Sequence, residues 1–408
     1  MTAPSELAAQ SEHGPVRHPV IGAEQGAGTP RLACVPDSPA PELPLRPDLV
    51  GEQPYGAPQL DVPHLLNVNE NPYAPPAEVI ADIAASVTAA SAGLNRYPDR
   101  DFRDLRGELA AYLERESGAT GLTADHVWAA NGSNEVMLHL LQAFGGPGRA
   151  VMSFGPTYSM YPEYARDSLT QWVEGSRRPD YSLDPDATIA HIEQVRPAVV
   201  LLASPNNPTG TALPLDDVRA IARACEGTGP DGAATVLVVD EAYAEFRREG
   251  TPSALSVLAD FPHLAVARTM SKAFALAGAR VGYLAAAPRL VDCLRIVRLP
   301  YHLSAVTQAV ARAALRHTDA LQAQVTQLRA ERDACVTWLR DQGFTVADTD
   351  ANFVLFGPFE DRHAVWQGLL DRGVLIRETG PKQYLRVSIG TADQMAAFRG
   401  ALKEVTGR

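Results

Sequence analysis

The sequence predicts an α/β protein in which helices cover both faces of a mostly parallel central sheet, followed by a smaller α+β domain. Short apolar runs flanked by turn residues alternate with segments of helical periodicity through the first two thirds of the chain. Parallel strands need crossover connections, and strands buried on both faces are continuously apolar, so this alternation favours a parallel sheet. Beyond Leu303 the pattern changes to long helical stretches and a few short β-like runs, which predicts the second domain.

The expected elements can be placed along the chain from their periodicity. Helices are expected at residues 77–92, 102–117, within 303–342 and near 362–372. Strands are expected at residues 150–153, 198–203, 235–239, 264–267, 281–286, 344–346, 352–356 and 384–389.

The domain organisation follows from composition as well as from this pattern. Residues 1–43 are rich in Pro, Gly, Ala and Ser without a sustained apolar period, which predicts a disordered leader. After it we expect an N-terminal arm at 44–74, a large domain at 75–300 and a small C-terminal domain at 301–408. A chain of 408 residues with 46% hydrophobic composition suggests more than one structural unit, because single cores stop growing at about 250–300 residues.

Charge and cysteine content exclude several classes of protein. The formal net charge of -12 disfavours binding to nucleic acid or to anionic membranes. The four cysteines are scattered without a CxxC pair, so we expect neither a disulfide framework nor a metal site. No signal peptide and no apolar run of the roughly 20 residues that span a bilayer are evident. A cytoplasmic protein is therefore expected.

The chain has three lysines, Lys272, Lys382 and Lys403, and the first stands out. Chemistry that passes through a Schiff base needs a lysine that loses its proton near neutral pH, which burial and neighbouring cations promote. Lys272 lies in an apolar, small-residue stretch between Arg268 and Arg280, whereas the other two lie in polar surroundings. An ordinary solvated helix lysine is the alternative interpretation.

Three further segments suggest a ligand site at the ends of strands. Asp240 ends the apolar run VLVVD, where a carboxylate can pair with a pyridinium nitrogen or simply cap a helix. The segment SPNNPTG places Asn206 and Asn207 after another strand. It is either a rigid turn that aims an amide at a ligand or a plain loop. The segment ANGSNE leads into a helix at Ser133, whose free N–H groups suit a phosphate and whose side chain suits an N-cap.

The order and spacing of these segments resemble the fold type I aminotransferases, which depend on pyridoxal 5'-phosphate, and among them the histidinol-phosphate aminotransferase family. The resemblance runs from about Leu45 to the C-terminus and looks most like actinobacterial members. The segments that carry it, besides VVDEAY at 238–243 and RTMSKAFALAGARVGY at 268–283, are PYGAP at 54–58, NVNENPY at 67–73, NRYPDRD at 95–101, AFGGPG at 143–148, RLPYHLSAVTQ at 298–308, DANFVLFG at 350–357 and LRVSIGT at 385–391.

The resemblance implies a role for each matching residue. Lys272 would form the Schiff base with the cofactor and move the proton, while Asp240 pairs with the pyridine nitrogen. It further implies a homodimer with a shared active site, and transamination between L-histidinol phosphate and 2-oxoglutarate. The remaining implied contacts are Tyr243 and Asn207 to O3', Tyr158 stacked on the ring, Ser133, Asn134, Thr269, Ser271 and Arg280 on the phosphate, Tyr97 on the phosphate in the neighbouring subunit, and Arg386, Arg377 and Tyr55 on the substrate.

The alternatives differ in substrate or in class. An aromatic amino-acid aminotransferase would use the same cofactor, because apolar pockets discriminate weakly between rings of similar shape. A decarboxylase of a phosphorylated amino acid would use the same lysine and aspartate. A non-catalytic sensor would need an attached partner domain. We interpret His302, in LPYHLS, as structural because Lys272 already serves as the base.

Overall fold

The structure is a computed structural model that describes residues 43–408. The chain divides into two units at Pro54, and the second comprises Tyr55–Arg408. The described part of the first unit contains a short 3-10 helix, Pro47–Leu49. The predicted leader lies outside the described residues except for Leu43, and the domain boundaries expected at residues 75 and 300 stay predictions.

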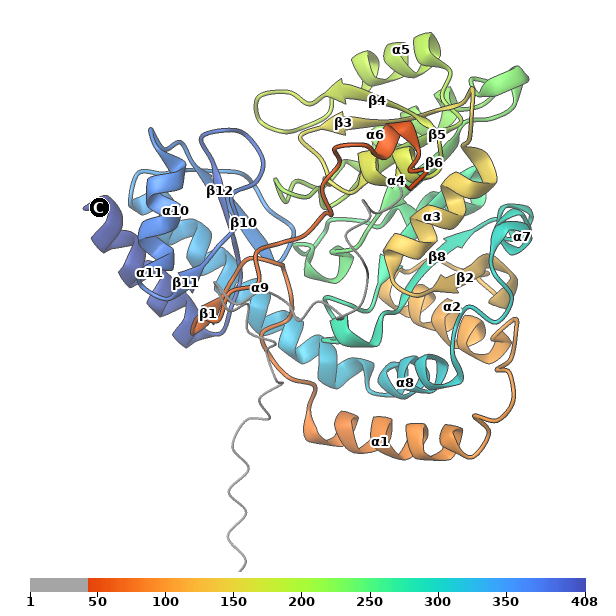
Figure 1. The fold of residues 1–408 in the computed structure, drawn as a ribbon, viewed down its shortest axis with the longest axis horizontal. Coiled ribbons are helices and arrows are strands. Elements are labelled where there is room, and N and C mark those ends of the chain that lie inside the picture. Colours follow the sequence, from red (N-terminus) through yellow and green to blue (C-terminus); the bar gives the residue numbers. More distant parts are fainter. Residues whose placement is uncertain (1–42) are drawn as a thin grey trace, which may run out of the picture. The chain divides into compact units, whose positions relative to one another are not determined.

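The second unit is built on a seven-stranded sheet with the order β2-β8-β7-β6-β5-β3-β4 (Figure 1). Its strands β3 to β7 run parallel to one another, and β8 is antiparallel to both of its neighbours. The sheet is therefore mostly parallel, as the sequence predicts. Its strands are β2 (Val127–Ala130), β3 (Ala150–Gly155), β4 (Gln171–Ser176), β5 (Val199–Ala203), β6 (Val236–Asp240), β7 (Leu264–Thr269) and β8 (Gly282–Ala286).

The register of the central strands brings polar residues together at one edge of the sheet. Ala203 of β5 lies opposite Asp240 of β6, and Asp240 lies opposite Ala267 of β7. Segments that follow these strands therefore begin side by side at the carboxyl edge, where open α/β sheets bind ligands. This edge receives Asn207, Asp240 and Thr269 from three separate stretches of sequence.

Two strands of the seven-stranded sheet were not expected from the sequence. Strand β2 is a run of four apolar residues, too short to stand out between two helical patterns. Strand β4 lies at the edge of the sheet, and its sequence QWVEGS mixes exposed polar with half-buried apolar residues. Because an edge strand is only partly buried, it lacks the continuous apolar run that reveals the central strands.

Several helix ends carry residues of recognised capping chemistry. Asp184 caps α5 by accepting from the backbone N–H of Ala187, and Ser304 caps α8 in the same manner through Thr307. Helix α2 ends at Gly118, whose φ of 73° suits glycine. The helices before residue 300 are α1 (Ala77–Ser91), α2 (Arg103–Ser117), α3 (Ser133–Phe144), α4 (Tyr161–Asp167), α5 (Pro185–Val195), α6 (Leu215–Ala224) and α7 (Pro288–Val297).

The C-terminal part packs helices against small sheets, as the α+β expectation requires (Figure 1). Strand β10 (Phe353–Gly357) pairs antiparallel with β9 (Thr345–Val346) and with β12 (Leu385–Ser388). Strand β1 (His64–Leu65) pairs in parallel with β11 (Val374–Leu375), which joins an early segment to this part. Its helices are α8 (Ala305–Arg316), α9 (Thr318–Asp341), α10 (Arg362–Leu370) and α11 (Ala392–Thr406).

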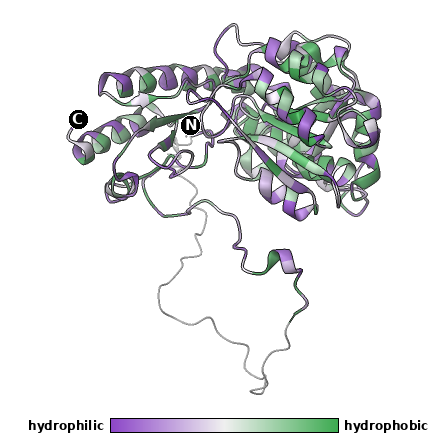
Figure 2. Ribbon diagram, turned by 90° about the horizontal axis from the view of Figure 1, so that it is seen from above, coloured by the Kyte–Doolittle hydropathy of each residue, from purple (hydrophilic) through white to green (hydrophobic). Residues whose placement is uncertain are grey.

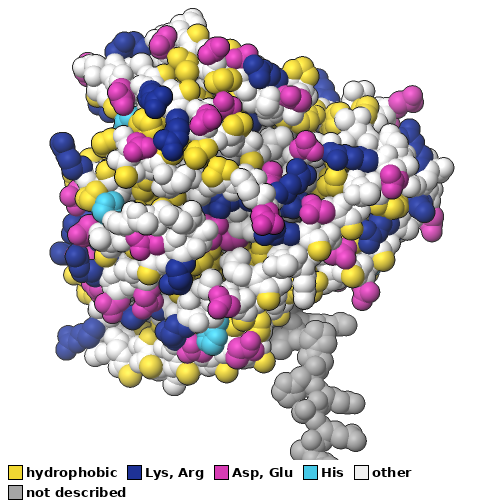
Figure 3. Space-filling model, turned by 180° about the vertical axis from the view of Figure 1, so that it is seen from behind, with side chains coloured by type: hydrophobic (Ala, Val, Ile, Leu, Met, Phe, Trp, Pro, Cys, Tyr) yellow, Lys and Arg dark blue, Asp and Glu magenta, His cyan; other side chains and the backbone are white. Residues whose placement is uncertain are grey.

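Apolar residues fill the interior, and charges of both signs cover the outside. Figure 2 shows hydrophobic strands within the sheet and hydrophilic outer faces on the helices that cover it. Figure 3 shows arginine and carboxylate side chains intermixed over the face that it draws. Among residues 43–408, no helix is both long and apolar enough to cross a membrane.

Candidate active site

A cavity of about 440 Å³ lies at the carboxyl edge of the central strands. This volume falls in the range of small-molecule sites. Nearly all residues that the sequence singled out line it, although they come from segments spread over more than 300 positions. The predicted residues that line the cavity are Tyr55, Ser133, Asn134, Tyr158, Asn207, Asp240, Tyr243, Thr269, Ser271, Lys272, Arg280, Arg377 and Arg386.

Lys272 provides the amine of the cavity. Its Nζ donates to the backbone carbonyl of Val68 at 3.0 Å. Burial lowers the pKa of Lys272 to about 8, with smaller contributions from the cations Arg386 and Arg280 and an opposing one from Glu70. A lysine of this pKa is partly unprotonated near neutral pH, so it can act as a nucleophile or as a base.

Asp240 is a buried carboxylate with both oxygens engaged. Its Oδ1 accepts from the backbone N–H of Ala242 at 3.2 Å, and its Oδ2 accepts from the hydroxyl of Tyr161 at 2.9 Å. Burial raises the pKa of Asp240 to about 6, and the hydrogen bond from Tyr161 opposes this shift. The carboxylate is therefore poised to pair with a protonated ring nitrogen.

Tyr243 receives two amide donors at its hydroxyl oxygen. Asn69 Nδ2 donates to Tyr243 Oη at 3.0 Å, and Asn207 Nδ2 donates to it at 3.5 Å. Burial raises the pKa of Tyr243, so the hydroxyl keeps its proton at neutral pH. That proton remains available as a donor to a ligand in the cavity.

A cradle for an anion lies where helix α3 begins. The backbone N–H groups at the start of α3, from Ser133 and Asn134, point out of the helix, since the first turn has no acceptor within it. Thr269 Oγ1 donates to Ser271 Oγ at 3.0 Å, and Arg280 Nη1 approaches Ser271 Oγ at 3.5 Å. Dipole, hydroxyls and guanidinium together suit a phosphate.

Two glycines allow the parts of this cradle to pack closely together. A Cβ added to Gly132, whose φ is 86°, would lie 2.5 Å from Arg280 Nη2. A Cβ added to Gly282 of β8 would lie 2.1 Å from the backbone nitrogen of Ser133. Glycine is thus required at both positions for Arg280 and strand β8 to approach the first turn of α3.

Two arginines define the other end of the cavity. Arg386 donates through Nη1 to Asn207 Oδ1 at 2.5 Å and through Nη2 to the carbonyl of Asn67 at 2.8 Å. Burial lowers the pKa of Arg386 to about 10, so it remains a cation at neutral pH. Arg386 Nε and Arg377 Nη1 are buried without a hydrogen-bond partner among residues 43–408. Unsatisfied buried donors of this kind suit an anionic ligand.

Tyr158 and Tyr55 add two further aromatic rings to the lining of the cavity. Tyr158 is half-buried, and its ring contacts that of Tyr161 edge to face, with centroids 5.5 Å apart. Tyr55 is 47% exposed and its hydroxyl pairs with Ser159 Oγ at 2.9 Å. These rings provide flat apolar surface next to the amine and the arginines.

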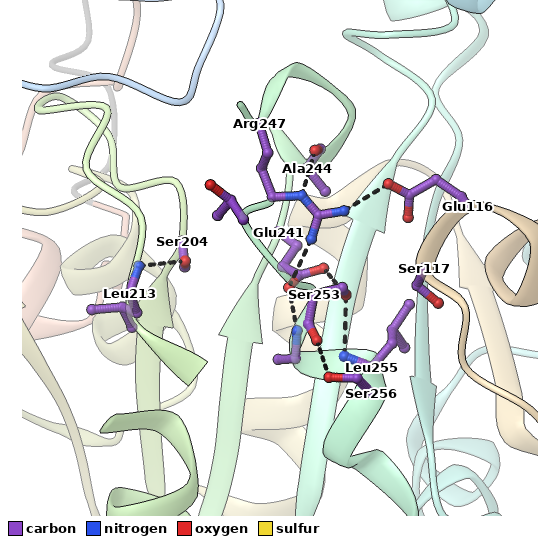
Figure 4. A network of polar contacts seen from close by, with 12 residues as sticks. Glu116, Ser117, Ser204, Leu213, Glu241, Ala244, Arg247, Ser253, Leu255 and Ser256 are labelled. Carbon is purple, nitrogen blue, oxygen red and sulfur yellow. Dashed lines mark hydrogen bonds and ion pairs between the residues drawn. The ribbon is translucent and has the colours of Figure 1, made fainter. Parts of the chain in front are cut away.

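Arg268 is the main departure from the sequence analysis, which placed it beside Lys272. It is fully buried and donates to Glu116, Glu241 and Glu245 at 2.9, 2.9 and 3.4 Å. The neighbouring Arg247 pairs with two of these carboxylates, Glu116 at 2.7 Å and Glu241 at 3.8 Å (Figure 4). Successive residues of a strand point to opposite faces, so Arg268 turns away from the cavity that Thr269 lines. The cations near Lys272 are Arg386 and Arg280 instead.

Tyr97 and His302 lie outside this cavity. Tyr97 is 81% exposed and stacks on Tyr301 with centroids 4.5 Å apart. A role for Tyr97 in a neighbouring subunit stays a prediction. His302 donates or accepts through Nε2 at the carbonyl of Ala129, at 2.9 Å, and stacks on Trp128. These contacts with strand β2 agree with a structural role.

Tyr161 and Asn69 are among the residues of this region that the sequence analysis overlooked. Tyr161 follows the predicted Tyr158 by three positions, and that spacing places both on one side of the turn that opens α4. Asn69 has a φ of 56°, a left-handed conformation that asparagine tolerates. The motif NVNENPY drew attention to this segment, yet no local signal shows that Asn69 contacts Tyr243.

The site thus combines an amine of lowered pKa, a buried carboxylate, a phosphate cradle and two cationic side chains for a second anion. Its donor set fits a ligand that carries an aldehyde, a ring nitrogen and a phosphate. Such a ligand could be held at three points while Lys272 reaches its aldehyde.

Fold and site define a class of enzyme, and comparison with known proteins supports it. The chain belongs to the family of class I and II aminotransferases, which matches residues 63–402. The crystal structure of histidinol-phosphate aminotransferase from Sinorhizobium meliloti, in complex with pyridoxal-5'-phosphate, shares the fold. Its TM-score is 0.76 at 23% identity, over 90% of this chain and 98% of that one.

Relatives of higher identity carry one particular name. Histidinol-phosphate aminotransferase from Thermobifida fusca is 59% identical over 90% of this chain and 96% of its own length. Histidinol-phosphate aminotransferase 3 from Burkholderia lata is 58% identical over 89% and 96%. The protein of that name from Bifidobacterium longum is 56% identical over 89% and 96%.

Proposed function

We propose that this protein is a pyridoxal 5'-phosphate-dependent aminotransferase that converts L-histidinol phosphate and 2-oxoglutarate to imidazole acetol phosphate and L-glutamate, a reaction of histidine biosynthesis. The observation that carries the proposal is that Lys272, Asp240 and Arg386 line one cavity. Relatives that are 56–59% identical over about nine tenths of the chain carry the name of this activity.

The cofactor would be held at both ends. When bound, pyridoxal 5'-phosphate supplies an aldehyde that takes up the amino group and a ring that withdraws electrons from the substrate Cα. The start of α3 would bind its phosphate with help from Arg280. Asp240 would accept the proton of the ring nitrogen, and Tyr243 would donate to the phenolic oxygen O3'. Tyr158 would cover one face of the ring.

Lys272 would serve in two ways during amino transfer. Its Nζ would hold the cofactor covalently before substrate arrives and release it to the incoming amine. The freed Nζ would then take the proton from the substrate Cα. Because burial lowers its pKa to about 8, Lys272 can accept this proton and return it at neutral pH.

The arginines would accept the anion of each substrate in turn. Glutamate presents carboxylates, whereas histidinol phosphate lacks an α-carboxylate and presents a phosphate. A guanidinium fork binds either group bidentately. The unpartnered Nε of Arg386 and Nη1 of Arg377 would supply these bonds, with Tyr55 closing the site from the solvent side.

We further propose a cytoplasmic homodimer whose active sites are shared. Tyr97 is exposed and apart from the cavity of its own chain, and an exposed tyrosine stacked on Tyr301 is suited to a partner surface. Co-expression of Lys272→Ala and Tyr97→Ala chains tests this arrangement. A mixed dimer would then contain one intact site, so activity above that of either variant supports sharing, whereas no recovery contradicts it.

The proposed function can be tested on one purified sample. A visible absorption band that borohydride fixes to the Lys272 peptide would establish the cofactor and its lysine. Amino donors would then be compared, with histidinol phosphate against phenylalanine. A kcat/KM for phenylalanine equal to that for histidinol phosphate would favour an aromatic aminotransferase. The absence of any band after pyridoxal 5'-phosphate is added would refute the proposal.

A further inference from the structure

Three consecutive residues, Asn67–Asn69, each contact a different functional side chain. The carbonyl of Asn67 accepts from Arg386 at 2.8 Å, and that of Val68 accepts from Lys272 at 3.0 Å. Asn69 makes its contact through its side chain, donating from Nδ2 to the hydroxyl of Tyr243 at 3.0 Å. Asn69 is 2% exposed. The third contact is the one that can be changed by mutation without altering the backbone.

Ser388 determines which way the amide of Asn69 faces. Ser388 Oγ accepts the backbone N–H of Asn69 at 2.9 Å, so its own proton is free to be donated to Asn69 Oδ1, at 2.8 Å. With Oδ1 bound in this way, Nδ2 faces Tyr243 and can only donate. The backbone is held as well, because Asn352 Nδ2 donates to the carbonyl of Asn69 at 3.1 Å.

Tyr243 is constrained from a second side by Asn207. Arg386 donates to Asn207 Oδ1, which leaves Asn207 Nδ2 facing Tyr243 Oη at 3.5 Å. The hydroxyl oxygen of Tyr243 has two lone pairs, and the two amides occupy both of them. Its proton must therefore point elsewhere, and the cavity that Tyr243 lines is the open direction.

We propose that Asn69 is a positioning residue that, by donating to Tyr243, turns the tyrosine proton toward the phenolic oxygen of the bound cofactor. This inference rests on the proposed function, since it needs a pyridoxal cofactor in the cavity. Although Asn69 also lines the cavity, its proposed role is exerted through Tyr243, and it takes no part in the amino transfer itself.

The expected consequence is a change in a titration that can be followed in the visible spectrum. A donor at the phenolic oxygen disperses its negative charge, so the oxygen holds the proton of the nearby linking nitrogen less firmly. Loss of that donor raises the pH at which the absorption band of the cofactor-loaded protein changes. One charge-assisted hydrogen bond accounts for a shift of about one pH unit.

Asn69→Asp and Asn69→Gly distinguish positioning from mere packing. In Asn69→Asp the carboxylate still accepts from Ser388 but offers Tyr243 an acceptor, which draws the tyrosine proton away from the cavity. In Asn69→Gly the donor is lost without backbone strain at positive φ, and the tyrosine proton stays free. The proposal therefore predicts a larger midpoint shift for the aspartate, by about one pH unit. A packing role predicts the larger effect for glycine, which loses both contacts.

A double-mutant cycle with Tyr243→Phe separates the hydrogen bond from the added charge. If Asn69 acts through the hydroxyl, Asn69→Asp will shift the midpoint in the wild-type background and cause little further shift in Tyr243→Phe. An undiminished shift in the Tyr243→Phe background would mean that the charge acts through space, and would overturn the proposal.

Ser388→Ala provides a second route if the Asn69 variants do not fold. It removes the hydrogen bond that orients the amide, so a smaller upward shift of the midpoint is expected, and no shift would count against the proposal. The wild-type spectrum separates the two hypotheses. A wild-type protein without a band refutes the proposed function, whereas a wild-type band with unshifted variants refutes only the role of Asn69.

Discussion

The hydroxyl of Tyr161 lies 2.9 Å from Oδ2 of Asp240, and the tyrosine side chain is closed to solvent. Burial raises the pKa of Tyr161 well above its usual value, so this hydroxyl acts as a donor throughout the physiological range. It therefore stabilises the ionised form of Asp240, which burial alone disfavours.

Tyr161→Phe should weaken cofactor binding by about five- to tenfold, the effect of losing one buried hydrogen bond of ~1 kcal/mol. Without the donor, the pKa of Asp240 rises above about 6, and less carboxylate is available to the ring nitrogen near neutral pH. Fluorescence titration with pyridoxal 5'-phosphate between pH 5 and 9 measures this. Tyr164→Phe, one turn further along α4, is the matched control, and an equal loss there would remove the special role of Tyr161.

Asp240→Asn should stabilise the cofactor-free protein at pH 8 while impairing cofactor binding. The pKa of Asp240 is about 6 when folded against a model value of 3.8, so its contribution to stability is present below about pH 4 and is lost as the pH rises through 6. The cost at pH 8 is up to about 3 kcal/mol. In urea denaturation, the free energy of unfolding of the variant should exceed that of the wild type at pH 8 and equal it toward pH 4. A difference in unfolding free energy that stays constant across this pH range would contradict the raised pKa of Asp240.

Lys272→Ala should abolish amino transfer, whereas Lys382→Ala should leave it near the wild-type rate. The reason is that Lys272 lines the cavity and Lys382 does not. Steady-state assays with saturating cofactor, together with borohydride labelling of both variants, provide the measurement. Comparable losses in the two variants would mean that the site has been assigned to the wrong lysine.

Arg268→Met should destabilise the protein by about 3–5 kcal/mol, because Glu245 loses its cation within this network and Glu116 and Glu241 are left with Arg247 alone. Arg340→Met is the control, since Arg340 pairs with Asp348 at the surface, where ion pairs contribute about 0–1 kcal/mol. Guanidinium denaturation of both variants gives the comparison. Similar losses would show that the buried network contributes little.

Arg386→Lys should raise the KM for both amino donors, histidinol phosphate and glutamate, more than Arg377→Lys does. A lysine replaces the guanidinium fork with a single ammonium group and also breaks the contacts with Asn207 and Asn67. A 10- to 100-fold increase in KM is expected for Arg386→Lys, as for loss of about 1.4–3 kcal/mol of binding. If the two variants behave alike, the arginines share the anion equally.

Much of the fold could be predicted because its signals are local. The apolar runs of β5, β6 and β7 and the periodicity of α1, α2 and α9 match the expected ranges within a few residues. In the seven-stranded sheet, the short strand β2 and the edge strand β4 were not predicted, because neither has an apolar run long enough to differ from its surroundings.

The sequence by itself determined that Lys272 was the lysine to examine, since only three exist, and that Asp240 ends an apolar strand. Only the tertiary structure decided that Arg268 turns into a carboxylate network, and that Asn69 reaches Tyr243 across 174 positions of the chain. Side-chain direction and distant hydrogen bonds depend on how strands are paired and how loops close over their ends. Local periodicity does not encode these contacts, so the partners of a site residue emerge only when the chain has folded.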